Sequence, residues 1–482
     1  MMTNSRYAEF TRWGVFVADR ASGEPIYGLR EVERFIPGSV TKLYPAAAAL
    51  DAYGSEFRFR TPLYRTGALV DGVIDGDLVL VASGDPTMGG RDQPDGTMAF
   101  TETDHTYANV LPGAQWTDPD PLAGLDDLAR QAAAAGVERI SGDVIVDARL
   151  WPQMAKGEYV LSPIAINDNV IDLLVSPGIE GQPATLEVRP RSAAFQAEID
   201  VTTVGAEQPL ALTVDSPGAG RIVVRGQIAE GSAPALRIFQ IEDPPAFART
   251  LLIEALEREG IAVASPATGP NPTDRLPDPG SYRSENVVAT HESLPFAQLI
   301  RVTLKVSMNE MADVLVFLLA LKRGADTFDA GLQVIGEFLD ANGLARDVVS
   351  LGDGRGIDVS DLFGPRAICA LLLMMAERAD FDVFYDALPI LGVDGTERAA
   401  VPTDSLVKGR ARAKSGTSIA SNPMNQRLLV LAKASAGYLT GASGREVVYA
   451  VFMNDTEMTA IDDVFGLIDD QGAIAEALYA AL

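Results

Sequence analysis

The chain has 482 residues, a length that fits roughly three domains of ordinary size. Its 66 acidic and 39 basic side chains give a net charge of -27, which argues against nucleic acid and anionic membrane surfaces as partners. Two histidines and one cysteine make a zinc site hard to assemble, and no apolar run is long enough to span a membrane. We therefore expect no metal or other cofactor and no transmembrane segment.

The first predicted elements are a strand at 14–18 and an Ala-rich helix at 43–52, which Ser39 and Lys42 precede. Residues three apart at a helix start share a face, so we expect the Ser39 hydroxyl and the Lys42 amine to point the same way. A serine becomes nucleophilic when a base takes its proton, and lysine is such a base only if burial or a nearby cation lowers its pKa. The pair predicts acyl transfer without histidine. A triad built on His291 is the less favoured alternative, because neither histidine lies in a nucleophile-elbow sequence.

Ser-x-x-Lys spacing is weak evidence by itself, since it also occurs by chance. It recurs at Ser405 and Lys408, where no apolar helical run follows. We expect this second pair to lie in a solvated loop.

The middle of the chain, from residue 69 to about 280, has mainly the pattern of β-structure. A helix at 121–135 followed by a strand at 143–147 indicates a small nested α/β module. Residues 88–121 predict a long surface loop, and five prolines between 266 and 279 indicate a connection leading back to the first part of the chain. The other strands are expected at 70–74, 78–82, 199–204, 211–214 and 222–227.

Helices dominate after residue 295, and a second polar group precedes one of them. Ser307 and Asn309 place a hydroxyl and an amide on one side of a short segment. Taken alone, they are better explained as helix caps. The helices are expected at 295–303, 309–321, 327–342 and 365–378, the strands at 428–431 and 447–453, and a closing helix at 473–482.

A third polar group begins at Lys414, which Ser415, Gly416, Thr417 and Ser418 follow. A cation, flanking hydroxyls and a glycine that admits close backbone approach suit a carboxylate bound along a strand edge. Taken alone, the segment fits a turn equally well.

Together the three groups resemble the SxxK, SxN and KTG signatures of the penicillin-recognising serine hydrolases. More closely, the chain resembles peptidase family S13, the class C low-molecular-mass penicillin-binding proteins, which are DD-carboxypeptidases and endopeptidases. The resemblance covers nearly the whole chain and includes residues 37–43, 83–87, 166–170, 176–178, 291–295 and 388–396.

The resemblance implies a role for each matching residue. Ser39 would be the acylated nucleophile, Lys42 its general base, and Ser307 the proton relay to the leaving amine, supported by Lys414. The substrate-binding residues would be Asn309, Ser415, Thr417 and Ser418. The backbone N–H groups of Ser39 and Thr417 would form the oxyanion hole.

Three departures from the family pattern stand out. The third signature is KSG, which keeps the hydroxyl. Val359 occupies the place of an arginine that reads a substrate side chain in some relatives, with Arg355 close by. Residues 419–431 are longer than the usual strand connection in the family.

The long separation of Ser39 from Ser307 indicates a discontinuous catalytic domain with inserted modules. We expect an α/β (α+β) fold whose β-lactamase/DD-peptidase-like catalytic domain, helices flanking an antiparallel sheet, spans 1–65 and 281–482. A β-rich insert would span 66–87 and 148–280, with the nested α/β module at 88–147.

The sequence thus predicts a serine D-Ala-D-Ala carboxypeptidase that acts on peptidoglycan peptides, with cross-link endopeptidase action as a further expectation, and that β-lactams acylate. One alternative is an esterase or D-amino-acid amidase on the same catalytic frame, motivated by the altered 353–359 segment. A non-catalytic peptidoglycan-binding module is less favoured, because the catalytic side chains are intact.

Residues 1–10 do not have the pattern of a signal peptide. A DD-peptidase meets its substrate outside the cytoplasmic membrane, so we expect an extracytoplasmic protein with a trimmed N-terminus. A misassigned start and a protein that stays inside the cell are the alternatives.

Overall fold

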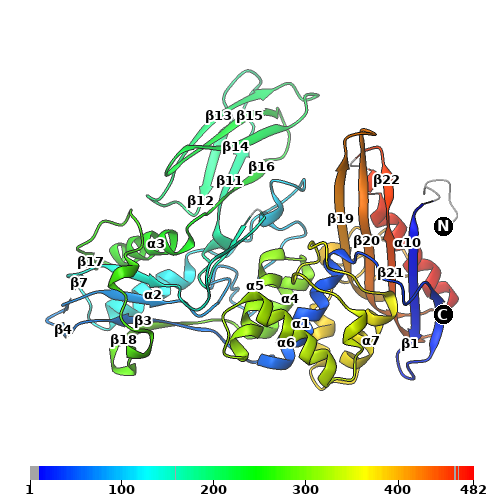
Figure 1. The fold of residues 1–482 in the computed structure, drawn as a ribbon. Helices are drawn as coiled ribbons and strands as arrows, with labels where there is room; N and C mark the ends of the chain where they lie inside the picture. The colour runs from blue at the N-terminus through cyan, green and yellow to red at the C-terminus, as the bar shows by residue number, and fades with distance from the viewer. Residues whose placement is uncertain (1–9, 158, 461–462, 465) are drawn as a thin grey trace. The chain divides into compact units, whose positions relative to one another are not determined.

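The computed structural model describes residues 10–157, 159–460, 463–464 and 466–482. The chain forms two compact units, one of Met1–Phe57 with Pro295–Leu482 and one of Arg58–Leu294 (Figure 1). The sequence placed the change of domain near residues 65 and 281, and its three-part division remains a prediction. The expectation about a signal peptide concerns residues that lie almost entirely outside the described ranges.

The first unit is built on a six-stranded antiparallel sheet of order β19-β20-β21-β1-β2, with β22 paired to β20. β19 is therefore an edge strand along most of its length. The strands are β1 (Arg12–Asp19), β2 (Pro25–Leu29), β19 (Ala411–Asn422), β20 (Arg427–Thr440), β21 (Glu446–Asn454) and β22 (Thr456–Met458).

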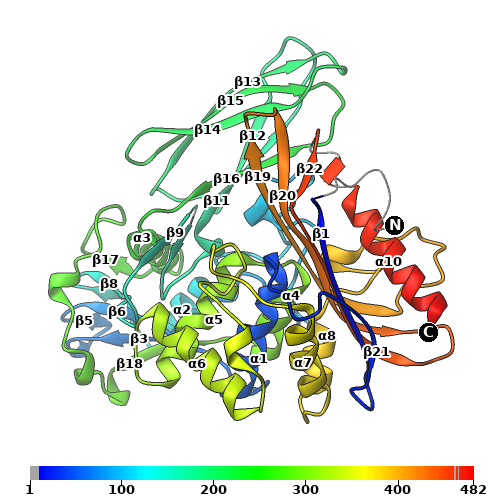
Figure 2. The same ribbon diagram turned by 45° about the vertical axis from the view of Figure 1, so that its right-hand side comes forward.

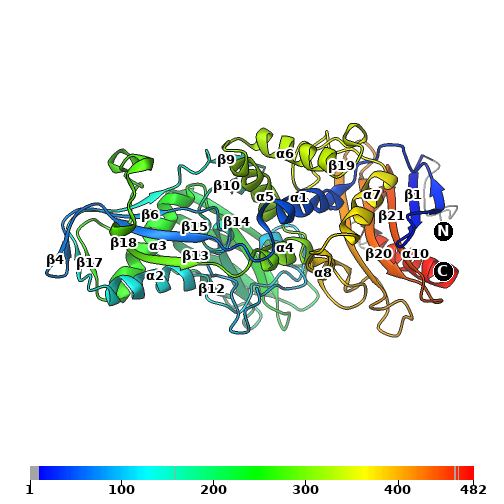
Figure 3. The same ribbon diagram turned by 90° about the horizontal axis from the view of Figure 1, so that it is seen from below.

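Helices cover both faces of this sheet (Figures 2 and 3). Lys433 and Ser435 of β20 line a small cavity against α10, whereas the Tyr438 hydroxyl donates to the Leu372 carbonyl of α7. Because side chains alternate along a strand, α10 and α7 pack on opposite faces. The helices are α1 (Leu43–Tyr53), α4 (Phe296–Lys305), α5 (Asn309–Lys322), α6 (Phe328–Ala341), α7 (Pro365–Ala376), α8 (Phe381–Ala387) and α10 (Leu467–Ala481).

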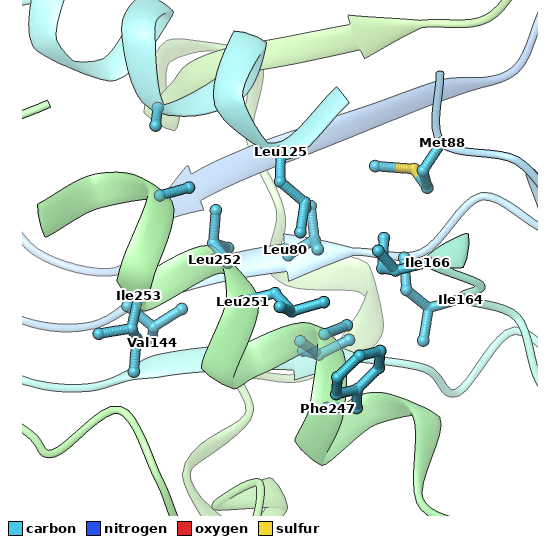
Figure 4. Close-up of a cluster of buried hydrophobic side chains, with 14 of the residues drawn as sticks. Leu80, Met88, Leu125, Val144, Ile164, Ile166, Phe247, Leu251, Leu252 and Ile253 are labelled. Atoms are coloured by element: carbon cyan, nitrogen blue, oxygen red, sulfur yellow. The ribbon is translucent and has the colours of Figure 1, made fainter. Parts of the chain in front are cut away.

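The second unit combines several smaller sheets with two helices. Helix α2 (Ala123–Ala134) packs on β18 and on α3 (Pro244–Arg258), and α3 packs on β8. Figure 4 shows the shared core, in which Leu125 of α2 and Leu251 of α3 meet Leu80 of β6. The sheets are β18-β3-β6-β8 (Val287–Glu292, Arg60–Arg65, Leu78–Val81, Val144–Asp147), β17-β7-β5-β4 (Ala262–Val263, Arg139–Ile140, Val73–Ile74, Leu69–Val70), β12-β11-β16 (Thr185–Arg189, Val170–Ser176, Ala235–Gln240), β13-β15-β14 (Gln196–Val204, Arg221–Ala229, Ala211–Gly218) and β10-β9 (Tyr159–Leu161, Met154–Lys156).

Several predicted elements need correction. The strand expected at 70–74 is a hairpin, because Asp71 and Gly72 both have positive φ and turn the chain between β4 and β5. The loop at 88–121 is not a surface loop throughout, since Arg91, Asp104 and His105 are buried in it. Helices α3 and α8 were not predicted. Over the described ranges, the helices are each too short or too polar to cross a bilayer.

Candidate active site

The Ser39 hydroxyl and the Lys42 amine are neighbours in a 3₁₀ turn, η1 (Gly38–Lys42), that leads into α1. Residues three apart eclipse one another in a 3₁₀ helix, so the two side chains share a face. Lys42 Nζ lies 2.8 Å from Ser39 Oγ. Lys42 is fully buried and Ser39 is half-buried, which leaves the hydroxyl within reach of a substrate.

Lys42 has three hydrogen-bond partners, and they suit a neutral amine. Its Nζ lies 2.7 Å from Asn309 Oδ1 and 3.1 Å from the Arg355 carbonyl oxygen, in addition to the Ser39 hydroxyl. The first two atoms only accept hydrogen bonds, whereas the hydroxyl also donates. A neutral amine has two N–H bonds for the two acceptors and one lone pair for the Ser39 proton.

The electrostatic surroundings favour the same protonation state. Burial, and after it the positive charge of Lys414, hold the pKa of the Lys42 amine well below its ordinary value. The carboxylates of Asp353 and Asp313 act in the opposite direction on that pKa and are weaker causes. Lys42 is therefore placed to accept a proton.

The turn η1 packs against β19, so the first and third signature segments meet. A Cβ atom on Gly38 would lie 3.0 Å from the Thr417 backbone nitrogen, and one on Gly416 would lie 2.9 Å from the Ser39 backbone nitrogen. Side chains at these two positions would push the segments apart. The glycines thus let the backbone N–H groups of Ser39 and Thr417 approach one another.

The second signature segment joins the same site through Asn309, the first residue of α5. Ser307 has φ +62° and is 9% exposed. The capping explanation for Ser307 and Asn309 is wrong, because the N-cap residue is Met308 and Asn309 is already the first residue of the helix. Ser307 thus lies in a tight turn of positive φ immediately before α5.

The loop of residues 394–397 contacts both the second signature segment, at Lys305, and the third, at Ser415. Lys305 Nζ lies 2.7 and 2.8 Å from the Asp394 carboxylate oxygens, and a Cβ on Gly395 would collide with the Lys305 carbonyl. Ser415 Oγ donates to Thr396 Oγ1 at 3.0 Å. Glu397 is 2% exposed, and burial raises its pKa.

Lys414 is fully buried on β19, and its Nζ donates to the Ser415 carbonyl at 2.7 Å. Burial lowers the pKa of Lys414 to about 7; Glu397 raises that pKa and Lys433 lowers it further. Thr417 is exposed. Ser418 is half-buried at a register shift and, by the alternation of the strand, points away from Thr417.

Asp353 fixes the loop that supplies the Arg355 carbonyl to Lys42. Its carboxylate accepts from the backbone N–H groups of Arg355 at 2.9 Å, Gly356 at 2.6 Å and Asp358 at 3.1 Å. Asp361 Oδ1 accepts from the Gly352 N–H at 2.8 Å, and burial raises the Asp361 pKa to about 8 with a further increase from the Asp353 charge. A hydrogen bond between the two carboxyl groups further raises the pKa of Asp361 and lowers that of Asp353.

Sequence reasoning gave no role in the site to Lys305, Lys433, Asp353, Asp394 and Glu397. One signal in the sequence was the scarcity of lysine, since the chain has only seven. Four of them are buried at this site with at most 8% exposure, namely Lys42, Lys305, Lys414 and Lys433. The second Ser-x-x-Lys pair lies in a loop, as predicted, where Ser405 bonds Glu476 and Lys408 is exposed.

Comparison with known proteins finds similarity along nearly the whole chain. The model of the D-Ala-D-Ala carboxypeptidase 3 (S13) family matches residues 6–470. The D-alanyl-D-alanine carboxypeptidase of Actinomadura sp. (strain R39) is 27% identical over 469 residues, which cover 92% of this chain and 77% of that protein.

Two crystal structures of penicillin binding protein 4 (dacB) from Haemophilus influenzae share the fold. The first matches with a TM-score of 0.73 and the second, a complex with a β-lactam, with 0.70; each is 21% identical and covers 98% of both chains. This likeness confirms the predicted fold class, a DD-peptidase-like catalytic domain with an insert.

Proposed function

The chain belongs to the D-Ala-D-Ala carboxypeptidase 3 (S13) family of serine-type hydrolases, and we propose that it cleaves D-Ala-D-Ala ends of peptidoglycan peptides through an acyl-enzyme on Ser39. The observation that carries this assignment is the set of partners around Lys42. Two acceptors and one hydroxyl surround an amine whose pKa is lowered by burial. This arrangement supports a base that takes the Ser39 proton.

Acylation begins when Ser39 Oγ attacks the carbonyl carbon of the penultimate D-Ala and Lys42 Nζ accepts the hydroxyl proton. The backbone N–H groups of Ser39 and Thr417 stabilise the resulting oxyanion. The C–N bond then breaks, and the proton held by Lys42 passes through Ser307 to the amine of the leaving D-Ala, which leaves Lys42 neutral again. Water attacks the ester in the second half-reaction, with Lys42 again as base, and restores the Ser39 hydroxyl.

Substrate binding uses the groups along the edge strand. Ser415 and Thr417 would hold the terminal carboxylate, with Lys414 nearby and with Thr417 the more accessible of the two hydroxyls. The Asn309 amide oxygen bonds Lys42, so its Nδ2 group remains to donate to a substrate carbonyl. Because peptidoglycan lies outside the cytoplasmic membrane, we assign the protein to the cell envelope.

A second activity is favoured by one observation. Val359 is 93% exposed and Ile357 is 52% exposed, close in sequence to Arg355, whose carbonyl bonds Lys42. Val359 stands where some relatives carry an arginine. An esterase or D-amino-acid amidase on the same Ser39 would not need a cation at position 359. Comparing the turnover of a D-Ala-D-Ala peptide with that of short-chain esters distinguishes the two activities.

The direct test is intact-mass spectrometry after treatment with benzylpenicillin, which carries the amide and carboxylate that the site is proposed to recognise. We expect one adduct on wild type, located on the peptide that contains Ser39, and none on Ser39→Ala. The Ser405→Ala variant, which alters the second Ser-x-x-Lys pair, should label like wild type. An adduct of equal yield on Ser39→Ala would refute the proposal.

A further inference from the structure

Lys433 is a buried lysine that the proposed chemistry does not use, although it lies beside a hydroxyl assigned to the substrate. It is opposite Thr417 in the antiparallel β19–β20 ladder, and opposite residues project from the same face of a sheet. Lys433 Nζ lies 3.1 Å from Thr417 Oγ1. Lys433 is 8% exposed, whereas Thr417 is exposed. A buried amine thus supports a hydroxyl at the surface of the site.

A purely structural explanation would have Lys433 neutralise the buried Glu397, because an uncompensated buried charge is costly. Burial lowers the pKa of Lys433 to about 8, and Glu397 acts against this decrease. The hydrogen bond of the amine, however, goes to Thr417 and not to Glu397. Within the described part of the chain, Glu397 Oε1 has no hydrogen-bond partner. Neutralisation of Glu397 therefore does not explain where the amine points.

The contact constrains the Thr417 hydroxyl. Because Oγ1 accepts from Lys433, its own hydrogen points elsewhere and is available on the exposed side. A hydroxyl that accepts from an ammonium group is polarised and donates more strongly. The ligand group that matches a strong donor backed by positive charge is a carboxylate.

We propose that Lys433 orients and polarises Thr417 as a hydrogen-bond donor to the terminal carboxylate of the substrate. Lys433 is thereby a positioning residue that makes the enzyme select peptides with a free carboxyl terminus. This inference rests on the proposed function, which places that carboxylate at Thr417.

The test compares an N-acylated D-Ala-D-Ala peptide that has a free carboxylate with the same peptide as its C-terminal amide. For Lys433→Met we expect KM for the carboxylate peptide to rise about tenfold, because one charge-assisted contact is lost. Its kcat should stay within about threefold of wild type, and the kinetics of the amide peptide should not change. Lys433→Arg should restore most of the preference. Lys408→Met, which changes an exposed lysine, should match wild type.

A double-mutant cycle shows whether Lys433 acts through Thr417. We expect the double variant Lys433→Met/Thr417→Val to lose no more preference for the carboxylate than Thr417→Val alone. Should Lys433→Met fail to fold, Lys433→Gln replaces it, since it keeps a donor without the charge. An equal effect on both peptides, no effect, or independent effects in the cycle would overturn the inference.

The two proposals fail in different ways. A wild-type protein that forms no Ser39 adduct with benzylpenicillin and cleaves neither peptide would refute the proposed function. Normal acylation of wild type, together with an unchanged preference in Lys433→Met, would refute only the role of Lys433.

Discussion

The Lys305 amine lies 2.7 and 2.8 Å from the two carboxylate oxygens of Asp394, so a single ion pair ties the turn that carries Ser307 to the loop that carries Glu397. Lys305 is 2% exposed and also donates to the Leu388 carbonyl at 2.7 Å. The pair therefore acts as a positioning element for two of the three signature segments.

Removing Asp394 should destabilise the first unit, because Asp394→Ala leaves a buried ammonium without its counter-ion. We expect a loss of about 3 kcal/mol in the free energy of unfolding, measured with urea, and slower acylation by benzylpenicillin. The double variant Lys305→Met/Asp394→Ala should recover stability, since no charge is left unpaired. If Asp394→Ala is as stable as wild type, the ion pair does not hold these segments.

Substitution of Asp353 and of Asp361 by asparagine should have unequal effects on the acylation of Ser39. Asp353→Asn removes the anion that orders the Arg355 loop, so we expect acylation of Ser39 to slow by about tenfold or more. Asp361→Asn should stay within about twofold at pH 7, because an amide donates to Asp353 as the protonated Asp361 does. Equal losses in the two variants would contradict this assignment.

The raised pKa of Asp361 should also make the stability of the protein depend on pH. The pKa of Asp361 is raised in the folded protein from 3.8 to about 8, so its stabilising contribution is present below about pH 4 and is lost as pH rises towards 8. The Asp361→Asn variant has no carboxyl group at this position, so its stability does not fall for this reason as pH rises. We expect its melting temperature relative to wild type to increase between pH 5 and pH 8, which differential scanning fluorimetry would detect.

A buried charge cluster in the second unit holds the 88–121 loop on β11. His105 Nδ1 lies 2.7 Å from Asp172 and its Nε2 lies 2.9 Å from Asp168, while Arg91 bonds Asp104 at 2.7 Å and Asp168 at 2.8 Å. Asp172 and Asp104 raise the pKa of His105 to about 10 despite its burial, which acts in the opposite direction.

This cluster predicts a pH-dependent stability. Since the His105 pKa is raised from 6.5 to about 10, its contribution is complete below about pH 6.5 and is lost as pH rises through 10. The Asp104 pKa is lowered to about 2 by Arg91 and His105, so its contribution is lost as pH falls from about 4 to 2. Urea unfolding of His105→Ala should show a deficit of about 3 kcal/mol near pH 6 that shrinks towards pH 10. A deficit of the same size at both pH values would refute the role of His105 charge.

The local parts of this structure were predictable from the sequence. The helix after Ser39 follows from its Ala-rich run, and the spacing of Ser39 and Lys42 places both on one face of the preceding turn. Asn309 was recognised from a motif, although spacing alone favoured a helix cap. The order of the three motifs along the chain thus identified Asn309 as a site residue, which its local helix propensity did not.

The contacts that depend on strand register were not predictable. Lys433 faces Thr417 only because residues 419–431 extend the β19–β20 hairpin and a register shift follows Ser418. The turn between Asn422 and Arg427, which contains Pro423, was the one available signal of a hairpin there. The Lys305–Asp394 pair joins residues 89 apart, a distance at which sequence periodicity gives no information.

The protonation state of Lys42 tests the central claim most directly, and the chain has only seven lysines. In protein labelled with ¹³C at the lysine Cε atoms, the Lys42 resonance is assigned from its absence in Lys42→Met, and its chemical shift is followed with pH. We predict the shift of a neutral amine at pH 7.5. A Lys42 resonance that keeps the ammonium shift up to pH 10 would contradict the proposed mechanism.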